Sequence, residues 1–79
     1  MIEAPDHIEV FFVDDNTGWA AAQYDEEGNQ LGSAEFHFHK RDALREARGM
    51  SCGVWPIHIY AKDGRRLANA KLSRDYPAL

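Results

Sequence analysis

The first 39 residues of this 79-residue chain contain no lysine and no arginine. They carry nine acidic side chains, whereas the remaining residues carry all nine basic side chains and four acidic ones. The two halves therefore sum to −9 and +5, which gives −4 for the whole chain at pH 7. A net acidic chain repels polyanions at long range, which disfavours nucleic-acid binding. The asymmetry indicates two halves of one domain that attract each other, or alternatively a basic binding face.

Cysteine and long apolar runs are also scarce. The single cysteine, Cys52, excludes an intramolecular disulfide and is typical of a reducing compartment. The start of the chain, MIEAPDHIEV, has no basic segment and no long apolar run, which argues against a signal peptide or a membrane span. We therefore predict a cytoplasmic protein. The length predicts one small domain with a core over about residues 7–72 and frayed ends at 1–6 and 73–79.

Signatures of catalysis are missing as well. No serine stands in a nucleophile elbow, and no glycine-rich phosphate loop is present. The acidic pairs Asp14-Asp15 and Glu26-Glu27 fall in predicted turns, where solvated charge is expected. We therefore predict a protein that is not an enzyme, with no cofactor and no small-molecule substrate.

Apolar alternation with a period of two predicts three strands in the first half. They cover HIEVFFV (residues 7–13), GWAAAQYD (18–25) and QLGSAEFHF (30–38). The links between them, DDNTG and DEEGNQ, are short and rich in turn residues. Because tight turns join antiparallel neighbours, these strands are expected to form an antiparallel meander.

The period changes from Lys40 onward, where apolar residues recur at helical spacing up to a stop near Gly53. IHIYAK (residues 57–62) then predicts a fourth strand, an Asp63-Gly64 turn follows it, and RLANAKL (66–72) predicts a returning strand. The element order is βββαββ. We predict an α+β fold whose mainly antiparallel sheet has one helix packed on one face.

Three segments give the chain a family resemblance. They are Gly18-Trp19-Ala20 opening the second strand, DALREAR in the helix, and IHIYAKDGRR running into the Asp-Gly turn. In these the chain resembles a family of small bacterial proteins catalogued as domain of unknown function 2188, over roughly residues 7–76. It departs from the family pattern at His39-Lys40, where a helix-capping Asp, Ser or Thr is expected. The resemblance implies a fold but no activity and no catalytic residue.

Histidines raise the possibility of a metal site. His37 and His39 are two residues apart on a strand, so their side chains point to one side and are able to converge on an ion. A third ligand is needed, and the sequence offers His58, Cys52, Glu35 and His7 without a characteristic spacing. We therefore assign no metal site from the sequence, and His37, His39 and His58 are the weak candidates. The alternative is that His39 lies at the start of the helix.

Arginines form a stripe on the predicted helix. Arg41, Arg45 and Arg48 recur at i, i+4 and i+7, so they share the side opposite the apolar residues. This arrangement is able to bind phosphates and makes nucleic-acid binding an alternative function. It is equally the ordinary solvent-facing side of an amphipathic helix.

One helix covers one face of a sheet, which leaves the other face without a cover. We expect one set of apolar residues to lie beneath the helix: Ala34, Phe36, Phe38, Ile57 and Ile59. The uncovered face then carries Phe11, His37, His58 and Tyr60, and Val13 with either Trp19 or Tyr24 are further candidates for it. Exposed aromatic patches typically mark interfaces. We therefore predict an interaction module that forms a homodimer or binds a protein partner through this face. The alternative is that loops and terminal segments fold over it.

Overall fold

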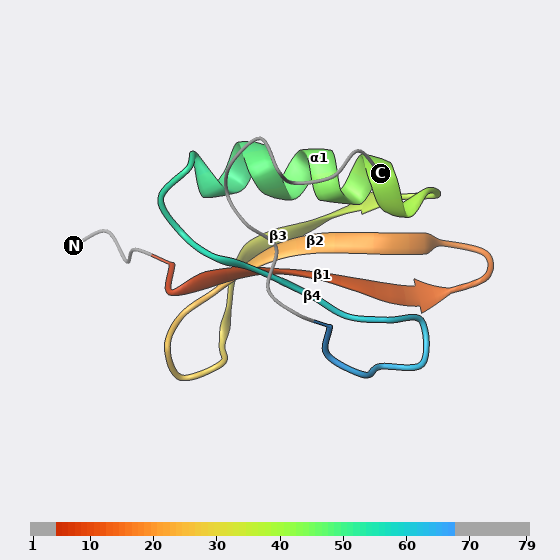
Figure 1. Ribbon diagram of the computed structural model, residues 1–79, viewed down its shortest axis with the longest axis horizontal. Coiled ribbons are helices and arrows are strands. Elements are labelled where there is room, and N and C mark those ends of the chain that lie inside the picture. Colours follow the sequence, from red (N-terminus) through yellow and green to blue (C-terminus); the bar gives the residue numbers. More distant parts are fainter. Residues whose placement is uncertain (1–4, 68–79) are drawn as a thin grey trace.

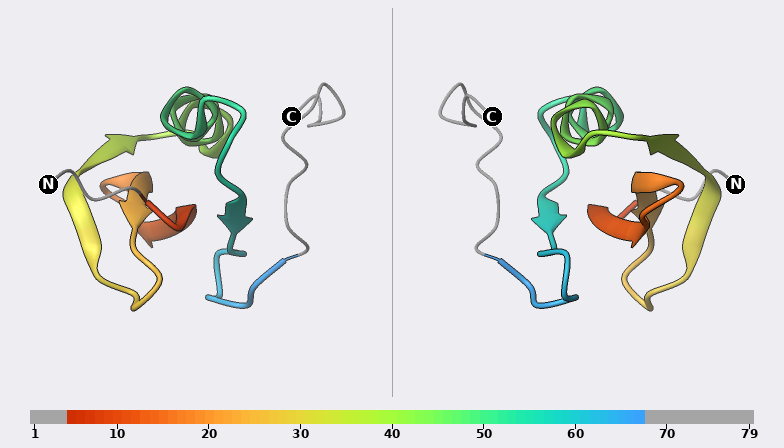
Figure 2. Two further views of the ribbon diagram at one scale, coloured as in Figure 1. Left: turned by 90° about the vertical axis from the view of Figure 1, so that its left-hand side faces the viewer. Right: turned by 90° about the vertical axis from the view of Figure 1, so that its right-hand side faces the viewer.

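A computed structural model describes residues 5–67 of the chain, which form one helix and a four-stranded sheet (Figure 1). The elements are β1 (His7–Asp14), β2 (Gly18–Tyr24), β3 (Gln30–His37), α1 (Lys40–Ser51) and β4 (Ile57–Ile59). The strand order is β3-β2-β1-β4. Figures 1 and 2 show α1 lying along one side of this sheet. The predicted α+β class is confirmed.

The sheet is mixed but mostly antiparallel. β1 pairs antiparallel with β2, and β2 pairs antiparallel with β3, as the short links between them predict. β4 pairs with β1 in parallel, with Ile8 opposite Ile57 and Val10 opposite Ile59. A parallel pair needs a crossover connection, which the chain makes through β2, β3 and α1. β1, the first strand in the sequence, therefore lies inside the sheet, beside the last strand described.

The core lies between α1 and the sheet. Its buried members are Ile8, Val10, Ala21, Ala43, Leu44, Ala47, Ile57 and Ile59. The apolar residues of α1 recur at helical spacing, so they form one stripe that faces the strands. Ile57 and Ile59 lie beneath the helix, as predicted.

Backbone geometry fixes both ends of α1. His39 is the N-cap residue, and its carbonyl oxygen accepts hydrogen bonds from the amides of Asp42 and Ala43. Cys52 is the C-cap in a left-handed conformation with φ of 54°, and Gly53 follows at 74°. The helix ends where the sequence predicts a stop. Among residues 5–67, no helix is long and apolar enough to cross a membrane.

The predicted Asp63-Gly64 turn is present. The amide of Ala61 donates to the carbonyl of Arg65 at 2.8 Å, and Tyr60 bridges Arg66 in antiparallel orientation. Only the start of the predicted fifth strand is described, because residues 68–72 lie outside the described range. The predicted frayed ends also fall outside it, apart from residues 5 and 6. Of these two residues, Asp6 donates a hydrogen bond from its backbone amide to the carbonyl oxygen of Tyr24 at 2.7 Å.

The side chains of β3 point to the opposite faces of the sheet from those predicted. Phe36 and Phe38 were expected beneath the helix, but they are 56% and 65% exposed. Opposite residues of paired strands share a face, and the partner of His37 is Trp19, which packs against the core. His37 therefore lies on the helix side, and its predicted place on the uncovered face is wrong. On the helix side the ring of His37 has a polar partner, Glu46 of α1, at 3.1 Å. The β2–β3 pairing is regular at Phe36 and His37, and its register irregularity lies further along, between Ala21 and Gln23.

Candidate functional site

The side of the sheet that faces away from α1 is the candidate functional site, and we call it the open face. Its residues follow from the pairing register and from alternation along each strand. They are His7, Glu9, Phe11, Ala20, Ala22, Tyr24, Phe36, His58 and Tyr60. Phe11, His58 and Tyr60 lie here as predicted.

His7 is the most densely bonded side chain of the open face. Its Nδ1 atom lies 2.9 Å from Oδ2 of Asp6, and its Nε2 atom lies 2.8 Å from Oε2 of Glu9. His7 and Glu9 are two residues apart on β1, so their side chains leave the strand on the same side. The ring is buried, with carboxylates at both nitrogens.

Two further rings stack on His7. The ring of His58 lies 4.2 Å away, centroid to centroid, at an interplanar angle of 15°. Tyr24 stacks on His7 at 5.7 Å. Tyr24 is opposite His7 in the antiparallel pair, and His58 is opposite Glu9 in the parallel pair. Three strands therefore bring these side chains together on one face.

The surroundings of the two histidines shift their pKa values in opposite directions. Burial by itself lowers the pKa of His7, but the hydrogen bonds to Glu9 and Asp6 stabilise the protonated ring and raise the pKa above the usual 6.5. Burial lowers the pKa of His58, and the positive charges of His7 and Arg66 lower it further. Burial also raises the pKa of Tyr24, and the charge of Glu9 adds to this effect.

We expect the two histidines to titrate on opposite sides of pH 6.5 when NMR follows their ring signals with EDTA present. Replacing Glu9 with glutamine should lower the pKa of His7, because it removes the charge-assisted hydrogen bond. Equal pKa values for His7 and His58 would contradict the described contacts.

The same shifts predict how stability depends on pH. A raised pKa means that the folded state holds its proton more tightly than the unfolded state. His7 therefore stabilises the fold fully below pH 6.5 and loses this contribution as the pH rises through its raised pKa. The lowered pKa of His58 acts in the opposite sense and costs stability as the pH falls below 6.5.

β3 forms one edge of the open face. Among residues 5–67 it pairs only with β2, so its outer backbone groups have no strand partner in that range. Phe36 is opposite Ala20, which is opposite Phe11. An apolar row therefore runs across the open face from β1 to this edge. Phe36 was not among the predicted interface residues, because its apolar character placed it in the core.

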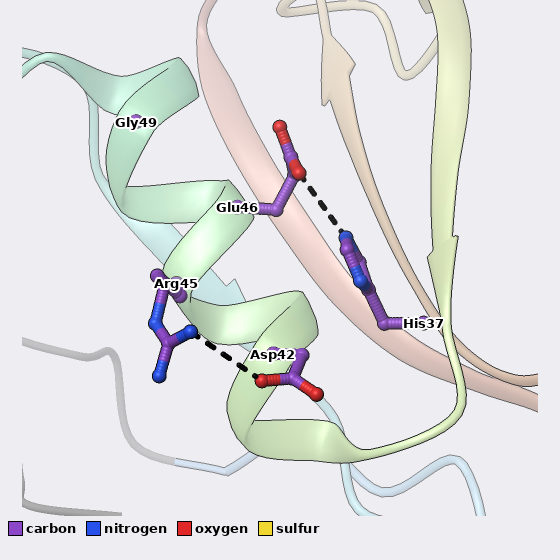
Figure 3. A pocket seen from close by; sticks show the side chains of 5 residues that line it. All are labelled: His37, Asp42, Arg45, Glu46 and Gly49. Atoms are coloured by element: carbon purple, nitrogen blue, oxygen red, sulfur yellow. Dashed lines mark hydrogen bonds and ion pairs between the residues drawn. The ribbon is translucent and has the colours of Figure 1, made fainter.

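His37 and His39 do not form a metal pair. Nε2 of His37 lies 3.1 Å from Oε1 of Glu46, so the ring points at α1 (Figure 3). His58 lies on the opposite side of the sheet. His39 is exposed at the N-cap, where its side chain makes no capping bond. The predicted candidates are therefore separated, because β3 ends at His37 and the chain turns into the helix.

The arginine stripe is on the surface, as predicted. The side chains of Arg41 and Arg45 are 66% and 78% exposed. Asp42 lies 3.9 Å from Nε of Arg41. It also lies 3.7 Å from a terminal nitrogen of Arg45 (Figure 3). Arg48 is also exposed. The stripe is therefore partly neutralised by an acid on the same helix.

Comparison with protein-family models, with curated proteins and with solved structures gives no match to this chain. The resemblance to domain of unknown function 2188 therefore stays a prediction.

Proposed function

We propose that this chain is a non-enzymatic, cytoplasmic interaction module that forms a homodimer by pairing β3 with β3 of a second copy. The observation that carries the proposal is Phe36, a large apolar side chain that is 56% exposed on an edge strand. Proteins usually protect such edges with lysine, proline or very short strands. β3 has eight residues, Gln30–His37, with no lysine and no proline.

The sequence of β3 is complementary to itself around Phe36. If two copies pair antiparallel with Phe36 opposite Phe36, Glu35 of each copy is opposite His37 of the other. The two phenyl rings then meet on the open face, while the Glu35–His37 pairs meet on the helix side. A two-fold axis makes the charged pair occur twice. Aromatic and opposite-charge cross-strand pairs each contribute about 0.2–1 kcal/mol.

The dimer is expected to be weak. In this register only residues 35–37 of each copy pair strand to strand, because β3 ends at His37 and α1 begins at Lys40. Such a contact buries less than the roughly 1,200 Å² of small stable interfaces. We therefore expect a dissociation constant on the order of 10–100 µM. At this affinity the two copies associate and dissociate readily, so the fraction of dimer changes with the concentration of the protein.

Replacing Phe36 with aspartate should weaken self-association at least tenfold, since the change puts two like charges opposite each other and removes the ring pair. Sedimentation velocity over a concentration series measures this. Val54 is the matched control, because it is 64% exposed in the link between α1 and β4, away from β3. Val54→Asp should leave the dimer unchanged.

A wild-type chain that stays monomeric up to about 500 µM would overturn the proposal.

Disulfide formation between two copies tests the register of the proposed β3–β3 pair. In a Cys52→Ser background, Phe36→Cys should form an intermolecular disulfide, because directly opposite residues of antiparallel strands lie within bonding reach. Val54→Cys in the same background should not. Equal cross-linking of both variants would contradict the register.

The alternative proposal is nucleic-acid binding by the arginine stripe. Its support is the exposure of Arg41 and Arg45, and the ion pairs with Asp42 weigh against it. Salt-dependent binding of RNA or DNA that is lost in an Arg41→Glu, Arg45→Glu variant would favour it. The same variant should leave the dimer intact.

A further inference from the structure

We propose that His7, Glu9 and His58 form a binding site for a divalent transition-metal ion of the zinc class. One ring nitrogen of each histidine and one carboxylate oxygen of Glu9 lie within 4.8 Å of one another. Among residues 5–67, this is the only group of three such side chains with that spacing. The site is separate from the β3 edge, because β1 and β4 lie at the other end of the sheet.

The donor set points to zinc. Imidazole nitrogen and carboxylate oxygen are ligands that Zn²⁺ takes, and sites with three protein ligands keep a fourth position for water or another molecule. Magnesium and calcium prefer sites built from oxygen atoms alone. Coordination requires both imidazoles to be neutral, and with the carboxylates of Asp6 and Glu9 the site then has a local charge of −2. A divalent cation neutralises this charge.

Asp6 supplies an independent structural argument. Metal-binding histidines usually donate their second ring N–H to a carboxylate or a carbonyl, which fixes the ring orientation and the tautomer. Oδ2 of Asp6 lies 2.9 Å from Nδ1 of His7, so Nε2 is the nitrogen left for an ion. That same Nε2 atom faces Glu9 at 2.8 Å. An ion at Nε2 therefore replaces the hydrogen bond to Glu9 and displaces its proton, while Asp6 keeps the ring in place.

The strands hold the two histidines at short range. His7 and Glu9 are neighbours on the same side of β1, and His58 is directly opposite Glu9 on β4. Tetrahedral zinc with bonds of 2.0–2.1 Å places its donor atoms about 3.3 Å apart. The donor atoms all lie within 4.8 Å of one another, so no pair needs to close by more than about 1.5 Å. Nε2 of His7 and Oε2 of Glu9, which are 2.8 Å apart, need to move slightly apart. Glu9 and His58 are only half-buried, which leaves their side chains room to rotate.

Titration of the metal-free protein with Zn²⁺, followed by calorimetry and by histidine ring NMR signals, tests the proposal. We expect saturable binding of one ion per chain, with shifts at His7 and His58 and none at His39. His58→Gln and Glu9→Gln should each weaken binding by more than about 100-fold, because each removes a direct ligand. Asp6→Asn should weaken it by about tenfold, since Asp6 only orients His7.

The His37–Glu46 pair is the matched control. It places a half-buried imidazole 3.1 Å from a carboxylate, as in the proposed site, but among the described residues it belongs to no three-ligand group. His37→Gln should change Zn²⁺ affinity less than twofold. Far-UV circular dichroism of every variant establishes that the fold is retained.

Two results would overturn the proposal. One is a wild-type chain with no saturable Zn²⁺ binding, and the other is an affinity that falls equally in His37→Gln and in His58→Gln. The Phe36→Asp variant should bind Zn²⁺ as the wild type does. The Zn²⁺ measurements and the dimer measurements therefore test the two proposals independently.

Discussion

Gly18→Ala is expected to destabilise the fold by about 3 kcal/mol or more, which is a large part of the stability of so small a domain. Gly18 begins β2 with φ of +96°. A methyl group there would lie 2.5 Å from the carbonyl oxygen of His37 and 2.6 Å from Cα of Phe38. Both contacts are with backbone, so the segment that joins β3 to α1 would have to move. Strain of this kind adds to the cost of the left-handed conformation.

Gly28 is the matched control for Gly18. It has a similar φ of +89°, but a methyl group there meets no atom within 4 Å. Gly28→Ala should therefore cost only the conformational term, about 1 kcal/mol. Urea unfolding of both variants measures the difference. Equal losses in the two variants would contradict the close backbone contacts described at Gly18.

Local patterns were enough to predict most elements of this fold. The period-two alternation of β1 and β2, the helical spacing of Ala43, Leu44 and Ala47, and the Asp63-Gly64 turn act over a few residues, and each is present where expected. The parallel pairing of β4 with β1 was not predicted, because it joins residues about 50 positions apart.

In β3, hydrophobicity alone predicts the wrong face of the sheet for each side chain. Phe36 is apolar and His37 is polar, which favours a phase with Phe36 in the core. The structure has the reverse, because pairing with β2 fixes the register and Glu46 on α1 gives His37 a polar partner. An exposed phenylalanine on a sheet edge is costly unless it is used. The reversed phase places Phe36 on the surface from which the proposed dimer is argued.

The His7 site was only partly visible in the sequence. The spacing of His7 and Glu9 along one strand places both on one face, and this signal is local. The approach of His58 depends on the parallel pairing of β1 with β4. The sequence therefore contained the ligands, and tertiary structure decided which histidines meet.

Leu44→Ala should destabilise the fold by about 3 kcal/mol. Leu44 is 1% exposed and is one of the largest fully buried side chains among the described residues. Its neighbours in the core include Ala21, Ala43 and Ala47, whose methyl groups are too short to fill the space that Leu44 would leave. The cost of a core truncation grows with the cavity that remains. A core rich in alanine should therefore tolerate this truncation poorly.

Arg45→Ala is the matched control, because Arg45 is the next residue on α1 and its side chain is 78% exposed. Removing it should change the free energy of unfolding by less than about 0.5 kcal/mol. Leu44→Met tests the role of volume, and it should cost less than about 1.5 kcal/mol because it fills nearly the same space. Comparable losses for Leu44→Ala and Arg45→Ala would mean that α1 is not packed on the sheet as described. The dimer and metal measurements both depend on that packing, since α1 holds the strands whose other side forms the open face.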